Sequence, residues 1–114
     1  MYQLIILLPA GSDLQSFDEG WPQFLEIAEQ LPGLIRESIT RFDQVIYGSE
    51  TIQRMYTFSF KDKKSLESAL ISEAGQKAGD VLHSLSGGNI TILTGDHQSD
   101  TLERIQSYSP PKEN

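Results

Sequence analysis

The stretch "IQRMYTFSFK" (residues 52–61) decides the fold, because it alternates between two kinds of side chain. Its even positions carry Tyr56, Phe58 and Phe60, whereas small or polar residues such as Thr57 stand between them. Successive side chains of a β-strand point to opposite faces of the sheet, so this pattern predicts a strand with one aromatic face. Burial of apolar surface stabilises a fold by about 25 cal/mol per Å². We therefore expect the rings to pack against helices and the opposite face to stay open.

Three other segments have the composition of strands. The run "YQLIILL" (residues 2–8) is apolar on both faces, which predicts a central strand. In residues 34–47 the apolar residues alternate imperfectly, which predicts a long strand with a bulge. The run "NITIL" (residues 89–93) follows two glycines and predicts the last strand.

Helical periodicity marks the segments between these strands. In residues 21–31 apolar side chains recur at spacings of three and four, and Ser16 or Asp18 is a suitable N-cap for this helix. The "PG" pair at residues 32–33 ends it. Residues 62–86 predict a short helix and, after a second capping serine, a longer one.

The order of these elements is strand, helix, strand, strand, helix, strand. This order predicts a ferredoxin-like βαββαβ sandwich of the α+β class, a four-stranded antiparallel sheet with two helices on one face. We expect this domain to span residues 1–97. Residues 98–114 form a polar C-terminal tail, with a short helical turn around Leu102 and Ile105 before partial disorder.

The open face of the predicted sheet carries Met55 and half of the apolar residues of the first and last strands. Such a face is too apolar to remain in water. A second copy that presses the same face against it through a twofold axis covers it without any other partner. We therefore expect a homodimer whose two sheets pack into a dimeric α/β barrel.

Composition limits the partners and cofactors. An outward aromatic face would suit RNA bases, but the formal net charge of −7 and the lack of a basic stripe argue against nucleic acid. The chain has no cysteine and only two histidines, so we expect no disulfide, no metal and no cofactor. Its longest apolar run, residues 4–8, is too short to cross a membrane. A cytoplasmic location fits these features.

Two glycines stand four residues apart on the long predicted helix. Gly75 and Gly79 occupy positions where alanine would favour the helix by roughly 1 kcal/mol each. They permit either close packing of the helix against its neighbours or a pocket beside it. Both explanations remain open at the level of sequence.

Candidate ligand-binding residues are aromatic, apolar or imidazole side chains placed near the expected layer between sheet and helices. We select Trp21, Tyr47, Tyr56, Leu82 and His83, and among them His83 and Tyr56 are the candidates for acid or base catalysis. Each also has a purely structural explanation, since Trp21 belongs to the apolar stripe of its helix and His83 falls on the polar side of its own.

Arginines on the predicted strands are candidates for holding a carboxylate or an enolate, because a guanidinium binds such groups with two hydrogen bonds. Cross-strand ion pairs are the alternative explanation for them. These residues are Arg36, Arg41 and Arg54.

Three segments together resemble the EthD family of the dimeric α/β-barrel superfamily. They are "LPGLIRESITR" (residues 31–41), "MYTFSFKDKKSLESAL" (55–70) and "LISEAGQKAGDVLHSLSGGNITIL" (70–93). The resemblance covers residues 2–97 and implies a homodimer with an apolar pocket between sheet and helices. Many members carry a histidine on the first helix where this chain has Phe24 and Leu25, so chemistry that depends on that histidine is not implied here.

The resemblance leaves three functions open, because members of the family are often labelled oxidoreductase-like without a settled reaction. The first is a small-molecule-binding or accessory homodimer. The second is a cofactor-independent oxidoreductase, such as a monooxygenase, or an isomerase that acts on a hydrophobic small molecule. The third is a structural or regulatory dimer without a pocket. A cavity lined by Trp21, Tyr56, Leu82 and His83 would favour the first two.

Overall fold

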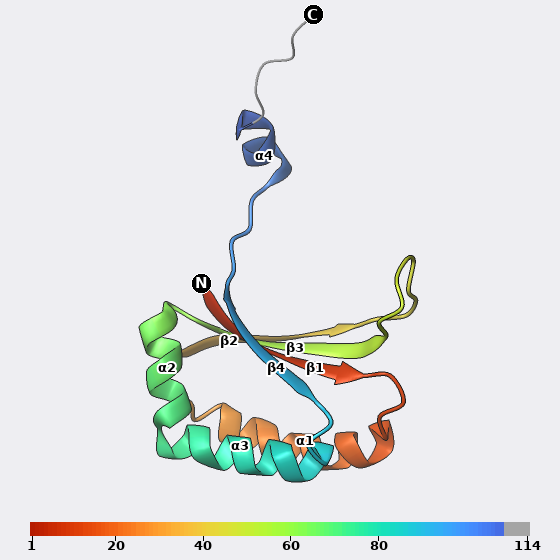
Figure 1. Cartoon of the computed structure of the whole chain (residues 1–114). Helices are drawn as coiled ribbons and strands as arrows, with labels where there is room; N and C mark the ends of the chain where they lie inside the picture. The colour runs from red at the N-terminus through yellow and green to blue at the C-terminus, as the bar shows by residue number, and fades with distance from the viewer. Residues whose placement is uncertain (109–114) are drawn as a thin grey trace, which may run out of the picture.

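The computed structural model describes residues 1–108, which form one sheet and four helices. The sheet is antiparallel with the order β2-β3-β1-β4, and α1 and α3 cover one of its faces (Figure 1). This arrangement confirms the predicted ferredoxin-like βαββαβ sandwich. The elements are β1 (Tyr2–Pro9), α1 (Leu14–Ala28), β2 (Leu34–Arg41), β3 (Ile52–Phe60), α2 (Lys63–Ile71), α3 (Glu73–Ser86), β4 (Thr91–Asp96) and α4 (Leu102–Tyr108).

The aromatic face of β3 points toward the helices, as its alternation predicts. Tyr56, Phe58 and Phe60 are buried, and β1 contributes Leu4 and Ile6 beside them, paired with Phe58 and Tyr56. Hydrophobic burial therefore fixes the orientation of the sheet, because a slip of one residue would turn every ring into water. The buried apolar core consists of Leu4, Ile6, Leu8, Phe17, Phe24, Ala28, Leu31, Tyr56, Phe58, Phe60, Leu66, Ala69, Ala78 and Leu82.

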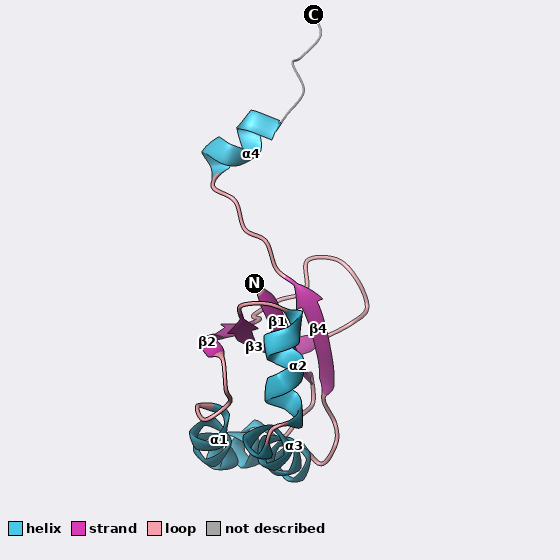
Figure 2. Cartoon of the chain, turned by 90° about the vertical axis from the view of Figure 1, so that its left-hand side faces the viewer, coloured by secondary structure: helices cyan, strands magenta, loops and turns pink. Residues whose placement is uncertain are grey.

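The other face of the sheet has no layer over it among the described residues (Figure 2). Thr57 and Ser59 are nevertheless only 6% and 3% exposed, because they are small and lie on a central strand between β1 and β2. Gln3 Nε2 donates a hydrogen bond of 3.2 Å to Ser59 Oγ across this face. The edge strand β4 presents Leu93, which is 47% exposed.

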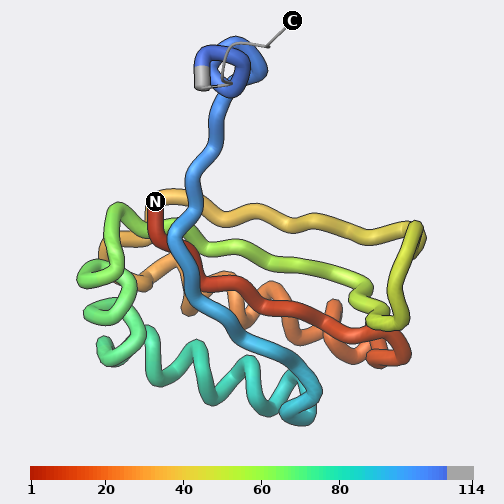
Figure 3. Tube along the Cα trace, turned by 45° about the horizontal axis from the view of Figure 1, so that its top comes forward, coloured from red at the N-terminus to blue at the C-terminus, as the bar shows by residue number. Residues whose placement is uncertain are grey.

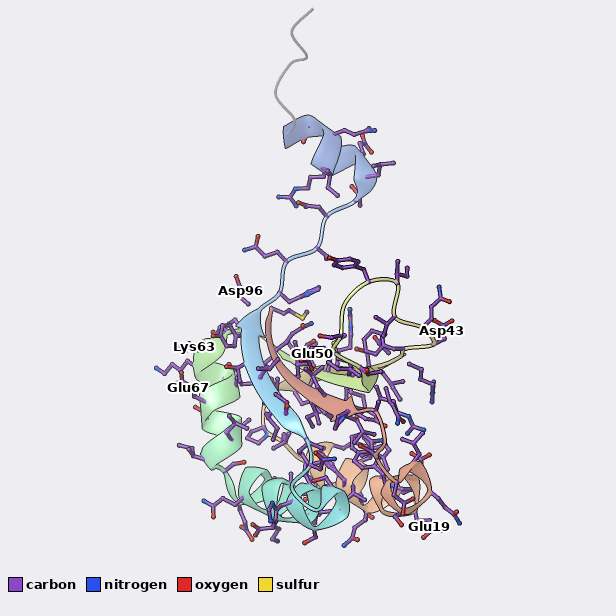
Figure 4. The ribbon with its side chains drawn as sticks, turned by 45° about the vertical axis from the view of Figure 1, so that its right-hand side comes forward. Glu19, Asp43, Glu50, Lys63, Glu67 and Asp96 are labelled. Carbon is purple, nitrogen blue, oxygen red and sulfur yellow. The ribbon has the colours of Figure 1, made fainter. Side chains whose placement is uncertain are left out.

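The second strand is shorter than its sequence predicts. β2 ends at Arg41, and residues 42–51 form a loop that rises on the open side of the sheet (Figure 1). The register of β2 with β3 ends at Arg41 and Arg54, and one further bond, from Phe42 N to Gln53 O, follows it. Figure 4 shows Asp43 and Glu50 on this loop. The pairing with β3 has a register shift between Leu34 and Arg36, near the start of the segment for which a bulge was predicted.

Helix starts follow the capping rules, with one correction. Asp13 caps α1 by accepting a hydrogen bond from Ser16 N, so neither Ser16 nor Asp18 is the N-cap. Asp62 and Ser72 cap α2 and α3, and Gly87, at φ +63°, ends α3. The last strand begins at Thr91 rather than residue 89, because Asn89 N still donates to Ser86 O at the end of the helix.

Beyond β4 the chain leaves the sandwich, and α4 stands apart from it (Figure 3). The expected helical turn around Leu102 and Ile105 corresponds to α4. The expected disorder concerns residues 109–114, which lie outside the described residues, and the domain limit at residue 97 stays a prediction. No helix within residues 1–108 combines the length and apolar character needed to cross a bilayer.

Candidate functional site

A cavity of about 290 Å³ lies between α1 and the inner face of β2 and β3; we name it the aromatic cavity. It forms because the inner face of β2 extends beyond the helix layer: every residue of β2 after Leu34 is exposed. The volume is near the lower end of the range for small-molecule sites. The cavity is lined by Asp18, Trp21, Leu25, Glu37, Ser38, Ile39, Arg41, Arg54, Tyr56 and Phe58.

One wall of this cavity is formed by the rings of Trp21, Tyr56 and Phe58, which pack against the buried rings of Phe17 and Phe24. The Trp21 ring centroid lies 4.1 Å from that of Tyr56, 4.8 Å from Phe24 and 5.2 Å from Phe17. Packed rings of this kind are rigid and attract flat apolar molecules by stacking. The wall is therefore suited to an aromatic or alicyclic ligand.

The opposite part of the cavity is polar. Arg54 Nη1 donates a hydrogen bond of 3.0 Å to Tyr56 Oη, and Arg54 Nη2 donates one of 3.1 Å to Asp18 Oδ2. The guanidinium is largely buried, while the Asp18 carboxylate is half exposed. The hydrogen bonds from Arg54 hold the pKa of Asp18 below its usual value. Those with Asp18 and then Tyr56 raise the pKa of Arg54, so both groups are charged.

Glu37 adds a titratable group at the β2 side of the cavity. The residue as a whole is exposed, yet partial burial of its carboxyl group raises its pKa, and the charge of Glu29 raises it further. With Arg41 nearby, the lining contains two acidic and two basic side chains, so their charges cancel. The cavity can therefore donate and accept hydrogen bonds without favouring a charged ligand.

A second, smaller cavity of about 170 Å³ lies between α3 and the sheet edge at β4; we name it the α3 cavity. Only Phe58 and Phe24 connect the two regions: Phe58 lines both cavities, and the two rings are in edge contact at 6.0 Å. The α3 cavity is lined by Leu4, Ile6, Phe24, Leu31, Phe58, Leu70, Gly75, Ala78, Gly79, Leu82, Ile92 and Thr94.

The predicted site residues do not line one common cavity. Trp21 and Tyr56 meet in the aromatic cavity, whereas Leu82 lines the α3 cavity. His83 is exposed on α3 and lines neither of them, and Tyr47 is 98% exposed on the loop after β2. Helical geometry separates Leu82 from His83, because neighbouring residues on a helix point about 100° apart, whereas Tyr47 lies on the loop that leaves the sheet.

Sequence reasoning missed both acidic residues of the aromatic cavity. Asp18 resembled a helix cap, and Glu37 stood in a strand with imperfect alternation. The position of Arg54 could be read from the sequence, because it stands two residues before Tyr56 on β3 and therefore points to the same face of the sheet. Within residues 1–108 no three His, Asp or Glu side chains lie close enough together to hold a metal ion.

Comparison with solved structures agrees with the ferredoxin-like class. A dimeric ferredoxin-like protein of unknown function from Jannaschia sp. CCS1 is 22% identical, covers 84% of this chain and 97% of its own, and superposes with a TM-score of 0.59. SnoaB, a cofactor-independent oxygenase from Streptomyces nogalater, is 13% identical, with 89% and 95% coverage and a TM-score of 0.60.

A further solved structure is more similar to the chain in both fold and sequence than these two. An ethyl tert-butyl ether d (EthD) family protein from Bacillus halodurans C-125 is 25% identical, covers 86% of this chain and 99% of its own, and has a TM-score of 0.76. The predicted resemblance to the EthD family is thereby confirmed. No protein-family model matches the chain, and no curated protein is similar to it at a significant level.

Proposed function

We propose that this protein is a homodimer that binds a hydrophobic small molecule with one uncharged polar group in the aromatic cavity. The observation that carries the proposal is the combination of a ring-lined wall with the Arg54–Tyr56 pair in one cavity. Arg54 already neutralises Asp18, so an anionic ligand would compete with that carboxylate for the same nitrogens. A hydroxyl or carbonyl group avoids this competition, because it needs only the hydroxyl of Tyr56.

The test uses Trp21, the only tryptophan of the chain, as a reporter. Its indole N–H gives one cross-peak in a ¹⁵N NMR spectrum, and a ligand in the aromatic cavity should shift it. We expect 1-naphthol to bind about fivefold more tightly than naphthalene, since one hydrogen bond to the Tyr56 hydroxyl contributes about 1 kcal/mol. In the Tyr56→Phe variant the two probes should bind equally.

The matched control is Tyr47→Phe, which removes a hydroxyl that lies in solvent. This variant should keep the preference for 1-naphthol. An unshifted indole signal at saturating 1-naphthol, or an unchanged preference in Tyr56→Phe, would contradict the proposed site.

The dimer rests on the open face of the sheet. Leu93 is exposed there, beside the partly buried Ile5 with which it pairs, and residues 42–51 rise on the same side. The solved structures that resemble the chain include dimeric ferredoxin-like proteins, which supports the same assembly here. Leu93→Arg should shift sedimentation at micromolar concentration from two chains to one, whereas Ile71→Arg on α2 should not. A wild-type chain that sediments as a monomer would contradict the proposed homodimer.

An enzyme without a cofactor, an oxygenase or an isomerase, is the second candidate function. The observation that favours it is Glu37, a carboxyl with a raised pKa in the lining of the cavity. Such a group removes a proton from carbon more readily than an ordinary carboxylate does. We expect the protein to accelerate exchange of the acidic C–H of 2-tetralone in D₂O, and Glu37→Gln to abolish the acceleration.

His83→Gln serves as the control for this assay, because His83 lies outside both cavities and should not affect exchange. If the protein exchanges no faster than buffer, the enzymatic candidate fails and the binding function stands alone. A purely structural dimer without a pocket receives no support from a chain with two cavities in this layer. The cytoplasmic location and the lack of a nucleic-acid partner stay predictions from composition.

A further inference from the structure

The α3 cavity differs in chemistry from the aromatic cavity. Eleven of its twelve lining residues are glycine or have hydrocarbon side chains, and Thr94 is the exception. No charged side chain lines it, whereas the aromatic cavity has four. A cavity of this kind gives no hydrogen bonds that would hold water in place, so an apolar occupant is favoured over solvent.

Gly79 is the residue of this cavity that packing does not explain. An added Cβ at this position would meet no atom within 4 Å, so a larger residue would fit the fold. Glycine is nevertheless a poor residue for the interior of a helix. Gly79 is exposed at the rim of the cavity, and together with the buried Ala78 it keeps the α3 side of the lining low opposite Ile92 of β4.

Gly75 contributes in a different way. An added Cβ there would lie 2.5 Å from the carbonyl oxygen of Leu70, so its absence lets α3 start directly against the last turn of α2. Figure 2 shows the result, with α2 upright at the end of the sheet and α3 running beneath it. This corner between α2, α3 and β4 is where the cavity opens, with Leu70 and Ile92 exposed at its lining.

We propose that the α3 cavity is a second binding site, for an uncharged hydrocarbon group of about benzene size, such as a monocyclic aromatic ring or a short branched alkyl group. The volume of about 170 Å³ is close to that of cavities of about 150 Å³ that bind benzene in proteins. It is too small for a helix or strand of another chain. Because the site shares only Phe58 with the aromatic cavity, its ligand is a separate molecule from the one proposed above.

The test uses toluene as the probe and methyl NMR signals as the readout. Toluene should shift the methyl signals of Leu82 and Ile92 and leave the Trp21 indole signal unchanged. Gly79→Leu should lower the affinity by about tenfold or more, because the new side chain fills the space that the ring needs. Ser84→Leu adds the same side chain to an exposed position of α3 that lies outside the cavity and should bind toluene as the wild type does.

Three outcomes would overturn the proposal. They are the absence of shifts at Leu82 and Ile92, equal affinity in Gly79→Leu, and a shift of the Trp21 indole alone, which would place toluene in the aromatic cavity. The proposal would also be overturned by methyl signals that change with protein concentration in the absence of toluene, because a side chain of a second copy would then occupy the cavity. Should Gly79→Leu fail to fold, Thr94→Phe fills the same space from β4 and is expected to give the same loss. None of these outcomes depends on 1-naphthol binding.

Discussion

Gly75 and Gly79 allow a sharp test of the structure, because the same substitution should have opposite effects four residues apart. Gly79→Ala places a methyl group in open space, so only helix propensity changes. We expect it to raise the free energy of unfolding by about 1 kcal/mol. Gly75→Ala places the methyl 2.5 Å from Leu70 O and 2.8 Å from Leu70 C, and closer still to the carbonyl oxygen of Ala69.

Those three atoms belong to the backbone of α2, so they cannot rotate away as the end of a side chain would. The helices must move apart, and overpacking of this kind lowers the free energy of unfolding by roughly 1–3 kcal/mol. Gly75 lies in the first turn of α3, where the higher helix propensity of alanine offsets less of this loss than it would in the middle of the helix. The two variants should therefore differ in stability by about 2–4 kcal/mol.

Urea unfolding followed by circular dichroism measures this difference, with thermal melting as a second assay. A change of 1 kcal/mol corresponds to about 4 °C in Tm for a domain of this size. Ser84→Ala, at an exposed position of the same helix, is the control and should stay within about 0.5 kcal/mol of the wild type. Equal stability of the two glycine variants would refute the close approach of α2 and α3.

Three further predictions concern the ion pair, a helix cap and the wall between the cavities. The lowered pKa of Asp18 means that its pair with Arg54 stabilises the fold above about pH 4, and this stabilisation is lost as the pH falls through the lowered value. In urea unfolding, Asp18→Asn should lower the free energy of unfolding by up to about 1 kcal/mol at pH 7. The variant should also lose less stability than the wild type when the pH is lowered. Asp62→Ala removes the acceptor of the Ser65 N–H and should lower the free energy of unfolding by about 1 kcal/mol, and an unchanged midpoint would contradict the cap. Phe58→Leu should lower the free energy of unfolding by about 1 kcal/mol in the same assay. It should also make the affinity for toluene depend on bound 1-naphthol, because the side chain that separates the two cavities becomes smaller.

The sequence determined the parts of the fold that depend on local pattern. Alternation in residues 52–61 gave the direction of Tyr56 and Phe58, because a one-residue shift would expose both rings. Helix caps at Asp62 and Ser72 were readable because a capping side chain bonds to a backbone N–H only two or three residues away. The end of β2 was not readable, because the apolar residues after Arg41 resemble a strand whether or not a partner continues beside them.

Only the tertiary structure decided which residues share a cavity. Sequence spacing placed Trp21, Tyr56, Leu82 and His83 in one layer. The packed rings of Phe24 and Phe58 divide that layer into two cavities. The two glycines likewise have one appearance in the sequence and two roles in the fold. A sequence pattern fixes which face of an element a residue occupies, whereas a cavity depends on distances between elements, and those distances are set by packing across the whole core.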